Sequence, residues 1–217
     1  MSTFDLFDGS AGRSPEQIAE GAWLLPGFAL AQARDLLAHI ASIDQQASFR
    51  HQTTPGGYRM SAAMTSCGQL GWVTDRTGYR YSPTDPLTGK PWPAMPGEFA
   101  GLASKAADAA GYPGFVPQGC LINRYETGAR MSLHQDKDEQ LLDAPIVSVS
   151  LGAPITFLFG GLDRTDPTTR YRLEHGDVVV WGGSSRLFFH GVAPLGKRAA
   201  HPETGAIRYN LTFRRVR

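Results

Sequence analysis

Three side chains have the types and the spacing to bind one metal ion. His134 and Asp136 form a His-x-Asp pair, and residues two apart on an extended chain point to the same side. His190 follows an apolar run and lies far enough downstream for several antiparallel strands to intervene. Two imidazoles and one carboxylate leave metal positions open, as non-haem iron(II) needs to bind O2 and a co-substrate, whereas structural zinc is closed by four ligands.

A second pattern, near the C-terminus, suits an anionic co-substrate. One face of a strand predicted over residues 207–213 and its flank carries Arg208, Asn210, Thr212 and Arg214. If that face points into a barrel, its two guanidinium groups need an anionic partner, and a dicarboxylate fits the planar fork of arginine. Asn123 and Tyr125 share one face of another predicted strand and offer further hydrogen bonds.

The elements that must position these residues are mostly strands. Seven or eight short strands without intervening helices favour an antiparallel sandwich or jelly roll over a parallel sheet. Apolar residues at helical spacing predict one helix over residues 29–46, and a second helix starts at Pro96 and ends before Gly111. The predicted strands cover residues 22–25, 60–65, 120–125, 146–151, 155–159, 171–173, 177–181, 186–190 and 207–213.

The segments before this β-rich half differ in character. Residues 1–20 are polar and are predicted to be a loose N-terminal segment. Residues 48–97 are rich in proline and glycine and hold Trp72, Tyr79 and Tyr81, which is typical of loops and hairpins laid over a core. These aromatic side chains either line a binding site or plug the edge of the core, and their spacing alone does not decide between the two.

Composition sets the outer bounds. The 217 residues are enough for one domain with a full core, and the net charge of +1 gives no global attraction to nucleic acid, so such binding needs a local basic surface. Two cysteines without a CxxC motif predict free thiols in a reducing compartment. With no signal peptide and no membrane-length apolar run, we expect a cytoplasmic protein without membrane association, and a monomer by default.

Each motif also has an ordinary structural explanation. His-x-Asp occurs by chance in solvated turns, His190 can end a strand with its ring satisfied by backbone, and an arginine-bearing strand face can point to solvent. Asp138, in an acidic run, can simply be a solvated charge. The combination of the His-x-Asp pair, a distal histidine and an arginine strand favours iron and 2-oxoglutarate chemistry.

A series of specific motifs runs through nearly the whole chain after residue 20. They are TPGGY (54–58), GW (71–72), YRYSP (79–83), KPWPAMP (90–96), AAGYP (109–113), CLINRY (120–125), LHQDKDE (133–139), APIVSVSLG (144–152), EHGDVVVWGG (174–183) and RYNLTFR (208–214). Through these motifs the sequence resembles the AlkB family of nucleic-acid dealkylating dioxygenases. Residues 1–20 and 196–206 follow the family poorly, and loop 163–166 is less basic than a phosphate-binding loop.

The resemblance implies a mainly β (α+β) fold, a double-stranded β-helix with flanking helices. It divides the chain into the loose segment 1–20 and one dioxygenase domain over 21–217, with a nucleotide-recognition lid at about 48–97 and the β-helix core at about 118–217. It implies Fe(II), 2-oxoglutarate and O2 as cofactor and co-substrates. Arg208 is expected to bind the distal carboxylate of 2-oxoglutarate, within a set comprising Asn123, Arg124, Tyr125, Tyr209, Asn210 and Arg214. The implied nucleotide contacts are Trp72, Tyr79, Arg80, Tyr81, Asp138 and Arg164.

The expected activity is oxidative demethylation of bases such as 1-methyladenine and 3-methylcytosine in DNA, preferably single-stranded, with RNA left open as a second substrate. Two other functions compete with it. The metal ligands alone are equally consistent with a dioxygenase acting on a protein or a small metabolite. A nucleic-acid-binding module that keeps the fold without catalysis is disfavoured, because all three ligands are intact.

Overall fold

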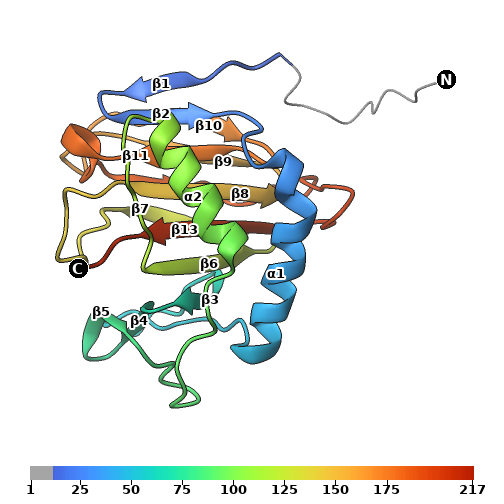
Figure 1. Ribbon diagram of the computed structural model, residues 1–217, viewed down its shortest axis with the longest axis vertical. Helices are drawn as coiled ribbons and strands as arrows, with labels where there is room; N and C mark the ends of the chain where they lie inside the picture. Colours follow the sequence, from blue (N-terminus) through green and yellow to red (C-terminus); the bar gives the residue numbers. More distant parts are fainter. Residues whose placement is uncertain (1–11) are drawn as a thin grey trace.

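The computed structural model describes residues 12–217 and is built from two antiparallel sheets, two helices and a small hairpin (Figure 1). The strands of the large sheet, in spatial order, are β1 (Glu16–Ala19), β2 (Ala22–Leu25), β11 (Val178–Trp181), β8 (Ile146–Gly152), β13 (Arg208–Arg214), β6 (Gly119–Tyr125) and β3 (Ala63–Gly68). The small sheet consists of β10 (Thr169–Leu173), β9 (Ile155–Phe159), β12 (His190–Val192) and β7 (Met131–His134), and β4 (Gly71–Asp75) pairs with β5 (Gly78–Ser82).

Strands β6 to β13 form the core and are shared between the two sheets. Strands β6, β8, β11 and β13 belong to the large sheet, and β7, β9, β10 and β12 belong to the small one. Every pairing between them is antiparallel. This topology confirms the predicted jelly roll, and it leaves an interior between the sheets in which strands distant in sequence face one another.

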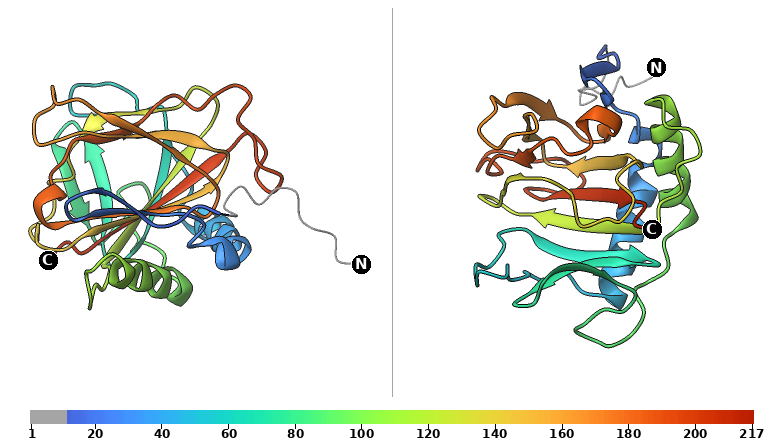
Figure 2. Two further views of the ribbon diagram at one scale, coloured as in Figure 1. Left: turned by 90° about the horizontal axis from the view of Figure 1, so that it is seen from above. Right: turned by 90° about the vertical axis from the view of Figure 1, so that its left-hand side faces the viewer.

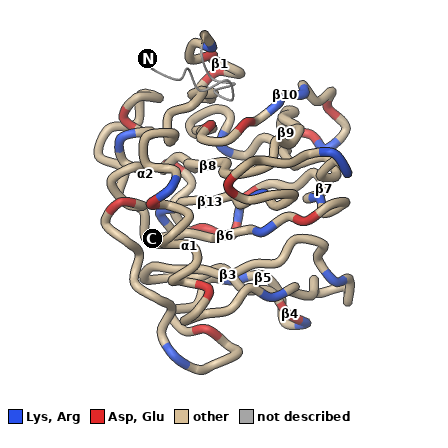
Figure 3. The backbone as a smooth tube through the Cα atoms, turned by 90° about the vertical axis from the view of Figure 1, so that its right-hand side faces the viewer, with Lys and Arg blue, Asp and Glu red and all other residues tan. Residues whose placement is uncertain are grey.

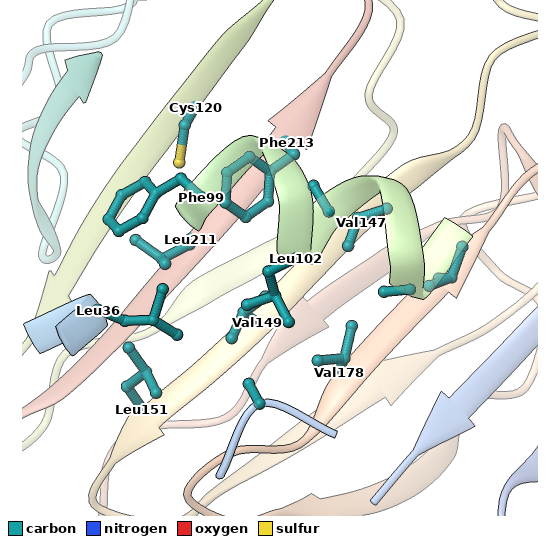
Figure 4. Packing of buried hydrophobic residues seen from close by; sticks show 14 of the residues in the cluster. Leu36, Phe99, Leu102, Cys120, Val147, Val149, Leu151, Val178, Leu211 and Phe213 are labelled. Carbon is teal, nitrogen blue, oxygen red and sulfur yellow. The ribbon is translucent and has the colours of Figure 1, made fainter. Parts of the chain in front are cut away.

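Both helices cover the outer face of the large sheet (Figures 1 and 2). Helix α1 (Ala33–Gln46) and helix α2 (Gly97–Ala109) bury their apolar sides against β8, β11 and β13. Figure 4 shows the contact, where Phe99 and Leu102 of α2 meet Val147, Val149 and Phe213 of the sheet. Burying one such side chain contributes about 1.5–3 kcal/mol, so these contacts fix both helices on the outer face of the large sheet. The opposite face of that sheet is left to line the interior.

Helix α2 ends where the sequence predicts, and its ending has a clear cause. Gly111 has a φ of +88°, a conformation that side chains other than glycine rarely adopt. Its N–H bonds to the carbonyl of Asp108, and the N–H of Tyr112 bonds to the carbonyl of Ala107, which is the double bond pattern of a Schellman cap. Among residues 12–217, no helix is long and apolar enough to span a membrane.

The structure adds detail to some sequence predictions and corrects the bounds of others. The loose segment 1–20 contains β1, which pairs with β2, while residues 1–11 lie outside the described residues. The helix predicted from residue 29 begins at Ala33, after a 3₁₀ turn over Leu30–Gln32. The lid predicted at about 48–97 includes β3, which extends the large sheet beside β6. The strand predicted over residues 186–190 starts only at His190, because a 3₁₀ turn over Gly183–Ser185 precedes a bent segment.

The remainder of segment 48–97 folds around a buried ion pair. Both terminal nitrogens of Arg50 donate to the Asp85 carboxylate, at 3.1 and 2.6 Å, and the guanidinium lies over the Trp92 ring. Asp85 also accepts from the N–H of Leu87, so one carboxylate fixes a turn and an arginine from a distant part of the segment. The β4–β5 hairpin is held beside this unit by Trp92, whose indole N–H donates to the carbonyl of Ser82.

Replacing Asp85 with alanine is expected to lower the free energy of unfolding by about 2 kcal/mol, the contribution typical of hydrogen bonds to a charged group. Urea titration followed by circular dichroism measures it. The matched control is Asp75→Ala, because Asp75 pairs with Arg80 on the exposed surface and such pairs contribute little. Equal effects of the two substitutions would show that the lid does not depend on the buried pair.

Candidate functional site

The jelly roll brings His134, Asp136 and His190 together at one end of the interior. Their ligand atoms all lie within 4.8 Å of one another. Nε2 of His134 is 3.6 Å from Oδ1 of Asp136, and Nε2 of His190 is 3.7 Å from Oδ2. Nδ1 of His134 bonds the carbonyl of Ser132, and Nδ1 of His190 bonds that of Phe188. Because carbonyls only accept, each Nδ1 carries the proton and each Nε2 lone pair is free for a metal.

Local chain geometry explains how these residues meet. Strands β7 and β12 pair with His134 directly opposite His190. Gly191 permits the close approach, because a Cβ there would lie 2.6 Å from the carbonyl oxygen of Met131. After β7 the chain leaves the sheet, and the amide of Gln135 donates to the carbonyl of Leu187, which ties the segment carrying Asp136 to the segment that precedes His190.

The charges around the triad favour the protonation states that bind a metal. Burial alone would raise the pKa of Asp136, but Arg214 and the neighbouring imidazoles hold that pKa well below its usual range. Burial, together with the adjacent ring of His134, lowers the pKa of His190 to about 4. At neutral pH the carboxylate is therefore charged and the His190 imidazole is neutral, so a metal ion does not compete with protons for these ligands.

The triad opens into a cavity of about 780 Å³ between the two sheets. Its floor is apolar, formed by residues such as Met64, Leu121, Phe157 and Trp181. Arg208 lies on the cavity wall with 2 % of its surface exposed, and its Nη2 donates to the hydroxyl of Ser150. Burial lowers the pKa of Arg208, and the neighbouring Tyr125 offsets only part of this effect.

Buried polar atoms on the cavity wall lack partners. Within residues 12–217, no hydrogen-bond partner is found for Nε and Nη1 of Arg208 or for the amide oxygen of Asn123. A buried, unpaired guanidinium is costly, so this position suits an anion that accepts from its two free donors. Asn123, Tyr125 and Asn210 line the same cavity, and the strand face predicted from residues 208, 210, 212 and 214 is buried and points inward.

Two residues assigned to the co-substrate lie on the opposite face of the large sheet. Arg124 is placed over the Phe49 ring and pairs with Glu126 at 3.4 Å. Tyr209 packs against the same phenylalanine, under α1. Both are outside the cavity because side chains alternate along a strand, so the neighbours of inward-facing Asn123, Tyr125, Arg208 and Asn210 must face outward. Neither side chain lines the cavity in which the other predicted co-substrate residues meet.

The mouth of the cavity carries the aromatic hairpin. Trp72 and Tyr79 stack with their ring centroids 5.5 Å apart and an angle of 19°. The indole N–H of Trp72 donates to the Asp138 carboxylate at 2.8 Å. Both rings and Asp138 line the cavity, as does Arg164, whose guanidinium lies over the Phe189 ring. The stack therefore forms part of a pocket wall and does not plug the core.

Arg80 and Tyr81 were assigned to the nucleotide together with Tyr79, but they do not line the cavity. Arg80 is on the outer side of the hairpin and pairs with Asp75 at 2.7 Å. Tyr81 points inward beneath the hairpin, where its hydroxyl donates to Glu139 at 2.5 Å. Tyr81 is held below the hairpin by Glu139, and the exposed Arg80 lies outside the cavity, so neither side chain lines it.

Comparison with known proteins decides the family. Residues 21–214 match the model of the 2OG-Fe(II) oxygenase superfamily. The chain is 61% identical to the alpha-ketoglutarate-dependent dioxygenase AlkB of Escherichia coli (strain K12) over 201 residues, 93% of each chain. The chain belongs to the AlkB family of 2OG-Fe(II) oxygenases.

More distant AlkB-family proteins are similar as well. The DNA N(6)-methyladenine demethylase ALKBH1C of Arabidopsis thaliana is 34% identical over 73% of this chain and 40% of its own length. The solved structure of OsALKBH1 superposes with a TM-score of 0.82 at 28% identity, covering 93% of this chain and 99% of that one. The jelly roll described above is therefore shared across the AlkB family.

As a 2OG-Fe(II) oxygenase, the protein is an enzyme that uses Fe(II), 2-oxoglutarate and O2. The residues present fit these groups. The donor set of two imidazoles and one carboxylate matches non-haem iron(II) and leaves coordination positions open. The unpaired nitrogens of Arg208 match a carboxylate at the far end of the co-substrate.

A second histidine cluster, at His175, His201 and Glu203, does not have the same character. The two rings stack 3.9 Å apart, and Nε2 of His175 is 3.9 Å from the Glu203 carboxylate. Nδ1 of His175 accepts from the N–H of Gly152 at 2.8 Å, so in the neutral ring the proton resides on Nε2. That nitrogen faces Glu203 as a donor and has no lone pair for a metal.

Two functional positions were missed from the sequence. Glu139 and Arg186 are buried and form an ion pair at 3.1 Å directly behind the metal ligands. Glu139 was read only as part of an acidic run, and Arg186 as the start of a strand. The one available signal is a pair of opposite charges between Asp136 and His190 in sequence, one shortly after the first ligand and one shortly before the second, which is too common to single out.

Proposed function

We propose that this AlkB-family dioxygenase removes N-alkyl groups from bases such as 1-methyladenine and 3-methylcytosine in DNA, preferably single-stranded, with RNA as a second substrate. The reaction oxidises the alkyl carbon, releases formaldehyde, and converts 2-oxoglutarate and O2 to succinate and CO2. One observation carries the proposal: a single cavity joins the His-Asp-His group, the unpaired Arg208 and the aromatic wall of Trp72 and Tyr79.

In this assignment, His134, Asp136 and His190 hold the iron, which supplies the oxidation of the alkyl carbon when bound. Arg208 binds the distal carboxylate of 2-oxoglutarate through Nε and Nη1, and the amide groups of Asn123 and Asn210 with the phenol of Tyr125 line its path. Arg214 acts indirectly, since its Nη2 donates to Asp136 at 2.6 Å. The apolar floor limits the entry of water and keeps these contacts strong.

The mouth is suited to an alkylated base. A base must leave its stack to enter an interior cavity, and a lesion that blocks pairing lowers this cost, which favours single strands and damaged bases. Trp72 offers a flat surface for stacking, and the ring of His134 lies on the metal side. Methylation at adenine N1 or cytosine N3 makes the base cationic, so the carboxylate of Asp138 attracts it and can accept from an exocyclic amine.

Contacts with the nucleic-acid backbone are local. Seen in Figure 3, Lys and Arg positions are interspersed with Asp and Glu positions, in keeping with the net charge of +1. The basic side chains at the cavity mouth are Arg59, Arg130, Lys137 and Arg164. We propose that these four side chains position the nucleic-acid strand.

We propose further that residues 21–217 form one domain, in which the lid spans about residues 48–97 and the catalytic core about residues 118–217. In this proposal the protein acts in the cytoplasm as a monomer.

Formaldehyde release tests the activity. The protein is incubated with Fe(II), ascorbate, 2-oxoglutarate and a single-stranded oligonucleotide, with the methylated and unmethylated strands compared side by side. We expect formaldehyde only from the methylated strand, with more from single-stranded than from paired DNA. Consumption of 2-oxoglutarate without formaldehyde from any methylated DNA or RNA strand would leave a dioxygenase with another class of substrate.

Trp72→Ala is expected to lower kcat/KM for the methylated strand by about 10- to 100-fold, since stacking on one base contributes about 1–3 kcal/mol. Decarboxylation of 2-oxoglutarate in the absence of nucleic acid should change far less, because Trp72 is assigned to the base and Arg208 to 2-oxoglutarate. Succinate and formaldehyde measured in the same reaction separate the two effects. An equal loss of both would contradict the stacking role.

A further inference from the structure

A closed network of buried charges lies directly behind the metal ligands. The Glu139 side chain is 1 % exposed, and both of its oxygens are used. Oε1 accepts from the hydroxyl of Tyr81 at 2.5 Å, and Oε2 accepts from Nη2 of Arg186 at 3.1 Å. Oε1 also forms an ion pair with Arg214, whose Nε lies 3.2 Å away. The side chains of the two arginines are themselves 7 % and 3 % exposed.

Both arginines continue to Asp136. Nη2 of Arg214 donates to Oδ2 of the carboxylate at 2.6 Å, and Nη1 of Arg186 donates to the main-chain carbonyl of the same residue at 2.6 Å. Arg186 also donates from Nε to the carbonyl of Ala144, which fixes the guanidinium plane. Arg214 therefore binds the side chain of Asp136 and Arg186 binds its backbone, and both guanidinium groups share Glu139 as their counter-ion.

The charges of this network balance only when Glu139 is present. Two guanidinium groups face two carboxylates, Asp136 and Glu139, all of them buried. If Glu139 is made neutral, Asp136 becomes the only anion for two cations, and Arg214 is free to turn its full fork onto the metal-binding carboxylate. The Asp136 carboxylate would then turn toward Arg214 and bind the metal less well, because a buried charge pairs with the nearest opposite charge.

The same carboxylate reaches the lid. Tyr81 comes from β5, on the same hairpin that carries Trp72 and Tyr79 at the cavity mouth. Burial raises the pKa of this phenol well above its usual value, so it stays protonated and acts as the donor to Glu139. A continuous chain of hydrogen bonds thus runs from the hairpin through Glu139 and Arg186 to the main-chain carbonyl of Asp136. Beside it, Arg214 forms ion pairs with both Glu139 and the Asp136 carboxylate.

We propose that Glu139 is a positioning residue that sets the metal-binding carboxylate of Asp136 and couples it, through Tyr81, to the β4–β5 hairpin. The inference rests on the proposed metal centre and adds a link between that centre and the nucleotide lid. It follows that metal binding steadies the hairpin and that a nucleotide held by the hairpin tightens the metal, since coupling between two sites is reciprocal.

Metal affinity is the first test, made anaerobically by calorimetric titration with Mn²⁺ as a redox-stable substitute for Fe(II). Glu139→Gln keeps the shape and removes the charge, and we expect about 10- to 100-fold weaker binding, the range typical of partners behind metal ligands. Glu98→Gln, the same change at an exposed site on α2, should bind Mn²⁺ like the parent. A Glu139→Gln protein that is folded and binds Mn²⁺ within about twofold of the parent would overturn the positioning role.

Hydrogen exchange of the β4–β5 amides tests the coupling with a milder change. In the parent, Mn²⁺ is expected to slow exchange in residues 71–82, and in Tyr81→Phe this slowing should be lost although the hairpin still forms. The same slowing in both proteins would overturn the coupling, even if Glu139→Gln failed to fold. His134→Ala separates this inference from the metal site itself. Full Mn²⁺ binding by His134→Ala would contradict the proposed metal centre. Loss of binding in His134→Ala, with normal binding in Glu139→Gln, would contradict only the role of Glu139.

Discussion

Replacing Arg208 with methionine is expected to raise the KM for 2-oxoglutarate by at least about 30-fold. Removing one partner of a buried, hydrogen-bonded charge pair costs about 2–5 kcal/mol, and about 1.4 kcal/mol corresponds to a factor of ten. Within the part of the chain that the structure describes, Nη2 of Arg208 donates to Ser150, and no partner is found for its Nε and Nη1. The same substitution should therefore leave the free energy of unfolding unchanged or increase it, because an uncompensated buried charge is removed.

The neighbouring strand supplies the matched control. Arg124→Met removes the same type of side chain from β6, which pairs with β13, but on the face that packs under α1. Its KM for 2-oxoglutarate should stay near that of the parent. Steady-state kinetics and urea unfolding of both variants test the prediction together. A large loss of stability in Arg208→Met without a change in KM would make Arg208 a structural residue.

Asp136→Asn is expected to weaken metal binding by more than about 100-fold, since losing even a group behind the ligands costs about 10–100-fold. The amide keeps the size of the carboxylate but carries no charge. Its oxygen would accept from Arg214, which turns the NH2 group, without a lone pair to offer, toward the metal. Formaldehyde release and succinate formation should fall together, because both need the same metal. This joint loss distinguishes a metal ligand from a residue such as Trp72, whose loss affects nucleic-acid turnover alone.

Calorimetric titration with Mn²⁺ measures the effect of Asp136→Asn directly. Asp108→Asn, on the exposed side of α2, makes the same chemical change outside the site and should bind Mn²⁺ normally. Retention of near-parental affinity by Asp136→Asn would contradict the assignment of this carboxylate to the metal.

The His134–Asp136 pair and the arginine strand could be predicted because short-range periodicity places their side chains on one face, whereas His190 joins them through the pairing of β7 with β12. The alternation of side chains places Arg208 and Asn210 on one face, and the buried interior makes that face functional. The same rule explains why Arg124 and Tyr209 do not reach the cavity, although they stand within the same motifs. When the whole of a strand motif is assigned to the site, it includes residues that face the helices. Only the alternation of side chains along the strand separates these from the residues that face the cavity.

The remaining differences arise from tertiary contacts that local sequence does not encode. The apolar run before His190 is typical of a strand, but the guanidinium of Arg186 is drawn inward to Glu139 and the Asp136 carbonyl, so the chain bends and pairing begins only at His190. Glu139 belongs to an acidic run that would ordinarily be solvated. Its burial depends on two arginines and a tyrosine that come from three distant parts of the chain.

The mass of a repaired oligonucleotide tests the central claim most directly. A single-stranded DNA with one 3-methylcytosine is incubated with the protein, Fe(II), ascorbate and 2-oxoglutarate, and the product is weighed by mass spectrometry. The account predicts a loss of one methylene unit that disappears with His134→Ala. An unchanged mass, with 2-oxoglutarate still consumed by the parent protein, would contradict dealkylation of this base and assign the dioxygenase to another substrate.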